Sequence, residues 1–278
     1  MFSKTILPVV MLAALLLNGC SFSGGWRTGY NIEKGKILYY SGFPATGHVL
    51  EGADPKSFEI IDNNYAKDKM HVYCRSEIIN GANPATFEWL GGAFSKDKSN
   101  GYYDTETISN DGPNFKIVPN PENQPGIVSA NGVMYARDRQ KVYSGDRVLD
   151  SADAATFAFL PMFNGNYLTY DRTNVYIHDR PLQGADGASF KRETEFHFKD
   201  KNAIWVLSLG RETKWIKMTD ADLATFTGLK RFYAKDKSHV YYEDGIVEGA
   251  DIASFEETEN HQAKDKNGSY QSGRLVKK

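Results

Sequence analysis

Short aromatic and β-branched runs alternate with polar turns along most of the chain, and residues 232–255 show this pattern most clearly. Phe-Tyr-Ala at 232–234 leads into Lys-Asp-Lys at 235–237, and Val-Tyr-Tyr follows at 240–242. Val and Tyr prefer strands, and the Asp244-Gly245 pair beside Ile-Val is a strong hairpin signal. The segment therefore predicts two or three short strands joined by tight turns.

The same unit recurs along the chain and is marked each time by an aspartate beside basic residues. The landmark aspartates are Asp68, Asp97, Asp138, Asp171, Asp200, Asp236 and Asp265. In four units a phenylalanine follows at one constant separation, and the pairs are Asp68 with Phe87, Asp138 with Phe157, Asp171 with Phe190, and Asp236 with Phe255. This register identifies a tandem repeat.

Each unit closes on a segment like Gly-Ala-Asp-Pro-Lys-Ser-Phe at 52–58. Asp or Asn stands where a helix N-cap would be, and Pro55 and Pro84 occupy the first helical position in two units. The closing segment therefore predicts a helix of one or two turns. We expect its phenylalanine to return an aromatic ring to the hairpin.

A unit of this size cannot bury its apolar face alone, so neighbouring units must stack. The sequence predicts a mainly β fold with short helices, built as a tandem array of about seven units of ~29 residues. Each unit is expected to hold a short β-hairpin or three-strand meander plus one helical turn. The array is expected to be solenoid-like or closed, with a leading half unit around residues 38–58 and a truncated unit at Asp265.

The first twenty residues have the layout of a secretory signal. Lys4 precedes an apolar run from Thr5 to Leu17, which is too short for a membrane-spanning helix. The run ends in Leu17-Asn18-Gly19-Cys20, which resembles the lipobox of bacterial lipoproteins. That resemblance implies acylation of Cys20, including palmitate, and attachment to the membrane through the N-terminal lipid. An ordinary signal peptide with an incidental cysteine is the alternative.

These features divide the chain into three expected parts: a signal peptide at 1–19, a lipidated N-terminus and tether at 20–35, and a repeat domain at 36–278. The compartment implied is the cell envelope. Ser21 after the cysteine favours the periplasmic side of the outer membrane if the source is Gram-negative.

The charge balance is close to neutral, with 33 basic and 35 acidic side chains. No basic field points to nucleic acid as a partner. The only cysteine besides Cys20 is Cys74, so the fold must hold without an internal disulfide. Cys74 takes the place of a repeat tyrosine, which favours a buried free thiol over a bridge in a dimer.

The landmark aspartates form a row of carboxylates that could bind calcium, but their basic neighbours disfavour a dication. We expect each to be a solvated charge in a turn. His71 and His239 occupy equivalent repeat positions without metal-ligand spacing nearby, so half-buried strand residues are favoured over ligands. No metal or cofactor is expected.

No Gly-x-Ser-x-Gly elbow exposes a serine nucleophile, and no pair of carboxylates has special status among the acidic residues. Most aromatic rings fall at repeat positions, which favours packing over sugar-stacking platforms. Two insertions interrupt the repeat, at 116–132 and near 207–219 with Trp215. Long loops on a repeat scaffold commonly carry binding surfaces, although both insertions could equally be tolerated without a function.

The Lys-Asp-Lys-x-x-Val-Tyr-Tyr pattern resembles the DKNYY repeat family of bacterial exported and envelope proteins. The likeness covers roughly residues 36–275 and is strongest at 65–87 and 232–255. Asp200-Lys201-Asn202 carries the naming tripeptide, although Trp205-Val206 departs from the tyrosine pair. The resemblance implies an architecture and a compartment, and no established activity.

Three functions remain open from the sequence. The first is a non-enzymatic envelope lipoprotein whose repeat scaffold binds a protein or cell-wall glycan, including an inhibitor or immunity-type partner. The second is an enzyme that acts on envelope polymers through carboxylates that the sequence does not place. The third is a purely structural role in the envelope.

Overall fold

The computed structural model describes residues 27–119, 135–162, 167–177, 179–209 and 213–276. These residues form eight antiparallel sheets in chain order, the first with three strands and the other seven with four. The signal peptide at 1–19, Cys20 and most of the first insertion lie outside the described residues. The fold is mostly β, as the repeat pattern predicts.

The strands of the first four sheets are β1 (Gly29–Glu33), β2 (Lys36–Ser41) and β3 (Thr46–Val49); β4 (Glu59–Ile60), β5 (Tyr65–Lys67), β6 (Val72–Cys74) and β7 (Glu77–Ile78); β8 (Glu88–Gly91), β9 (Phe94–Lys96), β10 (Gly101–Tyr103) and β11 (Glu106–Ser109); β12 (Lys116–Ile117), β13 (Tyr135–Arg137), β14 (Val142–Ser144) and β15 (Arg147–Val148).

The strands of the last four sheets are β16 (Ala158–Pro161), β17 (Tyr167–Tyr170), β18 (Val175–Ile177) and β19 (Arg180–Pro181); β20 (Lys191–Arg192), β21 (His197–Lys199), β22 (Ile204–Leu209) and β23 (Thr213–Met218); β24 (Thr227–Gly228), β25 (Tyr233–Lys235), β26 (Val240–Tyr242) and β27 (Gly245–Ile246); β28 (Glu256–Glu257), β29 (Gln262–Asp265), β30 (Gly268–Gln271) and β31 (Arg274–Val276).

The sheet β24–β27 shows how one repeat folds. β25 and β26 form the expected hairpin around the Lys-Asp-Lys turn, with Ala234 opposite Tyr241. Glu243 has a φ of 52°, and the tight turn at Glu243-Asp244 then leads into β27. A two-residue strand, β24, pairs with β25 on the other side. The unit is therefore a meander of four strands, one more than the pattern predicts.

The closing segments are single turns, which is the lower limit of the helix of one or two turns expected from the sequence. After β3, the amide of Ser57 donates to the carbonyl of Asp54 and its hydroxyl donates to the Asp54 carboxylate. Two closing segments form 3-10 turns, η1 (Gly112–Asn114) and η3 (Gly187–Ser189). The backbone is extended again at Phe190, because the chain must enter the next strand at once.

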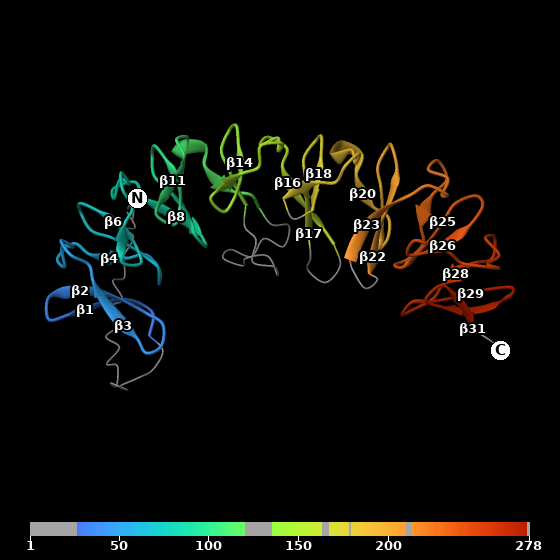
Figure 1. Ribbon diagram of the computed structural model, residues 1–278, viewed down its shortest axis with the longest axis horizontal. Helices are drawn as coiled ribbons and strands as arrows, with labels where there is room; N and C mark the ends of the chain where they lie inside the picture. Colours follow the sequence, from blue (N-terminus) through green and yellow to red (C-terminus); the bar gives the residue numbers. More distant parts are fainter. Residues whose placement is uncertain (1–26, 120–134, 163–166, 178, 210–212, 277–278) are drawn as a thin grey trace, which may run out of the picture.

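The sheets stack face to face along the array, because neighbouring residues of a strand point to opposite faces. Tyr73 packs with Tyr39 of the preceding sheet, whereas Val72 packs with Phe87 and with Tyr102 of the following sheet. As expected, the phenylalanine that ends each closing segment returns to the core. Figure 1 shows an open arc with the first and last sheets at its two ends, so the array is open rather than closed.

The arc has two edges that differ in their turns. The landmark-aspartate turns and the closing segments lie on the outer side, where Figure 1 shows the helical turns η1 and η3. We call this side the outer edge, and the side with the other turns the inner edge. The array already begins at β1, within the segment 20–35 expected as a tether. No helix of the described residues is long and apolar enough to cross a membrane.

The second insertion is a regular extension of a hairpin instead of a long loop. β22 and β23 are six-residue strands that pair along their whole length, with Leu207 opposite Trp215. The Trp215 ring packs against Phe198 at a centroid distance of 4.9 Å. The half-buried indole therefore packs against the core cluster that holds Phe198, which gives this insertion a packing role.

Candidate functional site: the outer edge of the array

Six of the seven landmark aspartates on the outer edge are buried and the last, Asp265, is half-buried, so the expectation of solvated turn charges is wrong. Asp236 is 4% exposed. Its Oδ1 accepts the amides of Ser238 and His239, both at 2.7 Å. Its Oδ2 accepts the Tyr241 hydroxyl and the amide of Asp222, also at 2.7 Å each. A buried carboxylate is tolerated here because both oxygens have donors.

The same arrangement recurs at the other landmark positions, except that at Asp138 the Ser109 hydroxyl replaces the amide of the closing segment. The aromatic residue five places after the aspartate donates to it in each unit, and the donors are Tyr73, Tyr102, Tyr143, Tyr176, Trp205, Tyr241 and Tyr270. At Asp200 the indole Nε1 of Trp205 donates at 2.9 Å. The apparent departure from the tyrosine pattern therefore preserves the hydrogen bond.

In six units the basic residue after the landmark aspartate forms an ion pair with the closing segment of the preceding unit. Lys237 lies 2.7 Å from the carboxylate of Asp222, and the Lys237 amide donates to Thr225 in the same closing segment. Five other units pair in the same way: Lys69 with Asp54, Arg139 with Asp111, Arg172 with Asp153, Lys201 with Asp186, and Lys266 with Asp251. The basic residues beside the landmark aspartates therefore form ion pairs between neighbouring units.

These contacts lower the pKa of carboxyl groups on both sides of the junction. Burial alone would raise the pKa of Asp236, but the amide donors and the Tyr241 hydroxyl outweigh it and lower the pKa. The hydrogen bond from Lys237, followed by those from Thr225, lowers the pKa of Asp222 to about 2. Both carboxylates are therefore ionised at neutral pH and serve as acceptors.

The structure places the two histidines and the second cysteine at separate points. His71 and His239 are half-buried as expected, but each lies just before its strand, and each ring is near the tyrosine hydroxyl two residues on. Cys74 is a free thiol that is 2% exposed, in agreement with the buried-thiol interpretation. Burial, followed by the nearby Asp104, raises the pKa of Cys74 to about 11, so the thiol stays protonated.

No group of three or more His, Cys, Asp or Glu among the described residues is placed to hold a metal ion. The sequence also missed a buried carboxylate at the inner edge. Glu257 is 3% exposed and accepts four successive backbone amides, from Lys230 to Tyr233. Its place next to Glu256 in a charged run gave no sign of burial.

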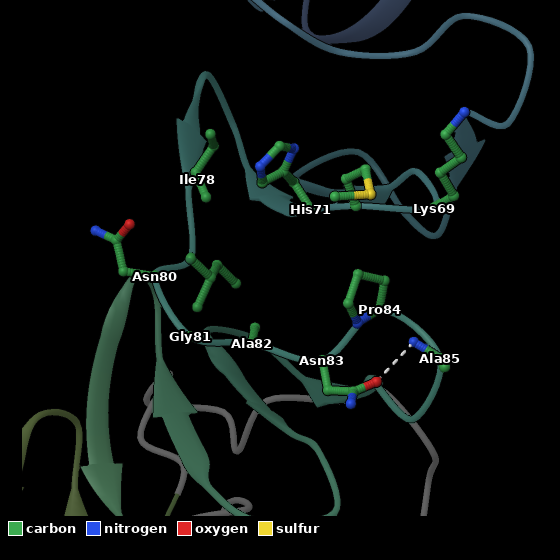
Figure 2. Close-up of a pocket in the computed structure, with 11 residues that line it drawn as sticks. Lys69, His71, Ile78, Asn80, Gly81, Ala82, Asn83, Pro84 and Ala85 are labelled. Atoms are coloured by element: carbon green, nitrogen blue, oxygen red, sulfur yellow. Dashed lines mark hydrogen bonds between the residues drawn. The ribbon is translucent and has the colours of Figure 1, made fainter.

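A groove of about 520 Å³ opens at the outer edge of the second sheet. Figure 2 shows the turn with Lys69 and His71 on one side and the closing segment with Asn80 to Ala85 on the other. Met70 in this turn is 64% exposed. The groove therefore combines an exposed thioether, an imidazole and amide groups within one repeat.

The groove lies where the repeat departs from its own pattern. Asn83 stands where most closing segments have aspartate, so this junction has no ion pair among the described contacts, although the Asn83 amide still donates to Asp97 at 2.8 Å. In the unit of Asp236, Ser238 and Glu248 take the positions of Met70 and Asn80. These differences were readable in the sequence, but only the structure brings them to one groove.

The chain is thus a tandem-repeat β protein whose units are joined by buried, hydrogen-bonded aspartates. The DKNYY family model matches residues 26–122 and 135–274. The chain therefore belongs to the DKNYY family. Neither the curated proteins nor the solved structures contain a match.

Proposed function

We propose that this protein is an envelope lipoprotein, anchored through acylated Cys20, whose repeat array is a non-enzymatic scaffold for a protein or cell-wall glycan partner. In a source with an outer membrane, it would lie on the periplasmic side of that membrane. The support for the anchor is the signal layout that ends in Leu17-Asn18-Gly19-Cys20.

The scaffold function is supported by one main observation, which is that the repeated charged side chains hold neighbouring units together. Repeated carboxylates such as Asp236 accept four hydrogen bonds at the junctions between units, which leaves them little capacity for acid–base chemistry. Exposed side chains differ between the repeats, and in the outer groove these include Met70 and Asn80. Met is adaptable at binding surfaces. We therefore place the partner's contact in this groove.

The anchor is tested by replacing Cys20→Ser and fractionating the cell. The variant is expected to leave the membrane fraction and to lose labelling by radioactive palmitate. Cys74→Ser is the matched control, because Ser144 holds the equivalent position in a later unit, and it should stay membrane-bound. Membrane retention of Cys20→Ser would contradict the anchor.

The binding site is tested by cross-linking in the envelope, followed by affinity capture and mass spectrometry. Met70→Arg should reduce recovery of the partner at least about tenfold, because a loss of 1.4 kcal/mol in binding changes the equilibrium by that factor. Ser238→Arg places the same charge at the equivalent position of another unit and should leave recovery unchanged. Equal recovery from both variants would exclude the groove, and hydrolysis of a glycan or lipid without any captured partner would favour an enzyme.

A further inference from the structure

One face of the first sheet has no other sheet against it among the described residues. The register of β1, β2 and β3 places eight residues on one side, which are Gly29, Asn31, Glu33, Lys36, Leu38, Tyr40, Gly47 and Val49. We call this side the N-terminal end face. The opposite side carries Ile37, which packs in the core with Tyr73 of the second sheet.

The N-terminal end face is partly apolar. Val49 is 37% exposed, and Leu38 and Tyr40 are half-buried. A Cβ at Gly47 would lie 2.9 Å from the Tyr40 ring and 3.1 Å from Leu38. Both side chains therefore lie close over β3, where any residue larger than glycine would need them to move.

The other end of the array has a different surface. The outward face of β28–β31 is exposed and almost entirely polar, and it consists of Glu256, Gln262, Lys264, Ser269, Gln271, Arg274 and Val276. A polar outer face is what a terminal repeat needs in order to remain soluble. The outward face of the last described sheet is therefore more polar than the N-terminal end face, which carries Leu38, Tyr40 and Val49 beside its polar residues.

Three cations lie on or beside the N-terminal end face. Arg27, Lys34 and Lys36 are exposed, whereas Glu33 is the one acidic residue between positions 27 and 49. The Arg27 guanidinium lies 4.3 Å from the centre of the Tyr40 ring. Glu33 accepts the Tyr40 hydroxyl and an amide hydrogen of Asn31, and it also pairs with Arg27 at 3.4 Å. The three cations nevertheless outnumber this one carboxylate. This sheet is therefore locally positive in a chain whose net charge is −2.

We propose that the N-terminal end face lies on the polar interface of the membrane and contacts anionic phospholipid headgroups. This inference rests on the acylation of Cys20. A chain from Cys20 to Gly29 spans at most about 30 Å when fully extended, so the first sheet must stay near the bilayer. Aliphatic side chains and a tyrosine fit the interface, and the surrounding cations fit anionic lipid. The array would then project away from the membrane, starting from its first sheet.

The test uses the acylated full chain in vesicles of phosphatidylethanolamine and phosphatidylglycerol, in a Cys74→Ser background. An environment-sensitive fluorophore is attached at Val49→Cys, with Val276→Cys on the C-terminal end face as the matched control. The label at position 49 should emit at shorter wavelength and lose intensity when the acyl chains are brominated. The label at position 276 should do neither. Leu38→Glu should reduce the quenching at position 49, because it places a carboxylate on the face.

Vesicle flotation separates the two levels of the proposal. If the protein does not float with the vesicles, the acyl anchor fails and the contact with lipid fails with it. If the protein floats but the labels at 49 and 276 behave alike, the anchor stands and the lipid contact is wrong. A blue shift at 49 without quenching by brominated lipid would assign the face to a second copy or another protein, which also overturns the proposal.

Discussion

At the scale of the residue, the landmark aspartate is the most informative position in the chain. The two carboxylate oxygens accept different hydrogen bonds. Oδ1 accepts backbone amides of its own turn, and Oδ2 accepts the hydroxyl or indole N–H of the aromatic residue five places later. In most units Oδ2 also accepts an amide of the preceding closing segment, as at Asp236. At Asp138 the Ser109 hydroxyl takes the place of that amide, at 2.7 Å. The junction therefore selects hydrogen-bond donors, and it tolerates changes in residue type that keep one.

Removal of one of these donors should cost a measurable part of the stability. Tyr241→Phe keeps the ring that packs near Phe226 at 5.7 Å but removes the hydroxyl that donates to Asp236. We expect the free energy of unfolding to fall by about 1–2 kcal/mol, as measured by urea denaturation. Tyr170→Phe, at a half-buried position next to a landmark aspartate, is the control and should change little. Equal effects of the two substitutions would contradict this assignment.

At the scale of the element, the closing segment is a short turn with an aromatic ring at its end. Phe255 lies between two sheets, with ring-centroid distances of 5.3 Å to both Tyr233 and Tyr270. The turn before it is held by Ser254, whose hydroxyl donates to Asp251. One phenylalanine thus packs one sheet on the next, and the turn brings it there.

Loss of this ring should loosen the last sheet before the rest of the array. Phe255→Ala should lower stability by about 3–5 kcal/mol and increase hydrogen exchange mainly in β28–β31, because each repeat contacts only its neighbours. Leu275→Ala, which truncates a side chain that is 52% exposed in the same sheet, is the control. Uniform loss of protection from β1 to β31 would show instead that the array unfolds as one cooperative unit.

At the scale of the whole molecule, the aspartates make the stability of the array dependent on pH. Burial raises the pKa of each, and the hydrogen bonds that it accepts outweigh this effect, so that the pKa is lowered on folding. This holds for Asp68, Asp97, Asp138, Asp236 and Asp265. A lowered pKa adds stability above the unfolded value of about 3.9, and this stability is lost as the pH falls through the folded value.

The free energy of unfolding should therefore stay nearly constant with respect to these groups from pH 7 to about pH 5 and fall steeply below about pH 4. Urea denaturation at a series of pH values measures this slope. Asp236→Asn should reduce stability at pH 7 and have a shallower acid slope than the natural chain. Asp244→Asn, at an exposed hairpin turn where asparagine is also favoured, should leave the slope unchanged. If stability falls with pH in the same way for the natural chain and both variants, the landmark carboxylates are not the source of the acid slope.

Local features of the fold were determined by the sequence alone. The repeat register, the hairpin around Lys-Asp-Lys and the return of Phe255 to the core depend on strand preference, turn chemistry and a constant separation. These are short-range properties, so they can be read without knowing which units touch. The burial of Cys74 followed in the same way from its place in the repeat.

Only the tertiary structure decided what depends on contacts between units. Lys-Asp-Lys reads as a solvated turn, but Asp236 is buried because the closing segment of the preceding unit covers it and supplies the amide of Asp222. The insertion near Trp215 reads as a loop, but packing on Phe198 makes it a strand. The open arc and the unequal end faces depend in the same way on how whole sheets stack, which no single repeat encodes.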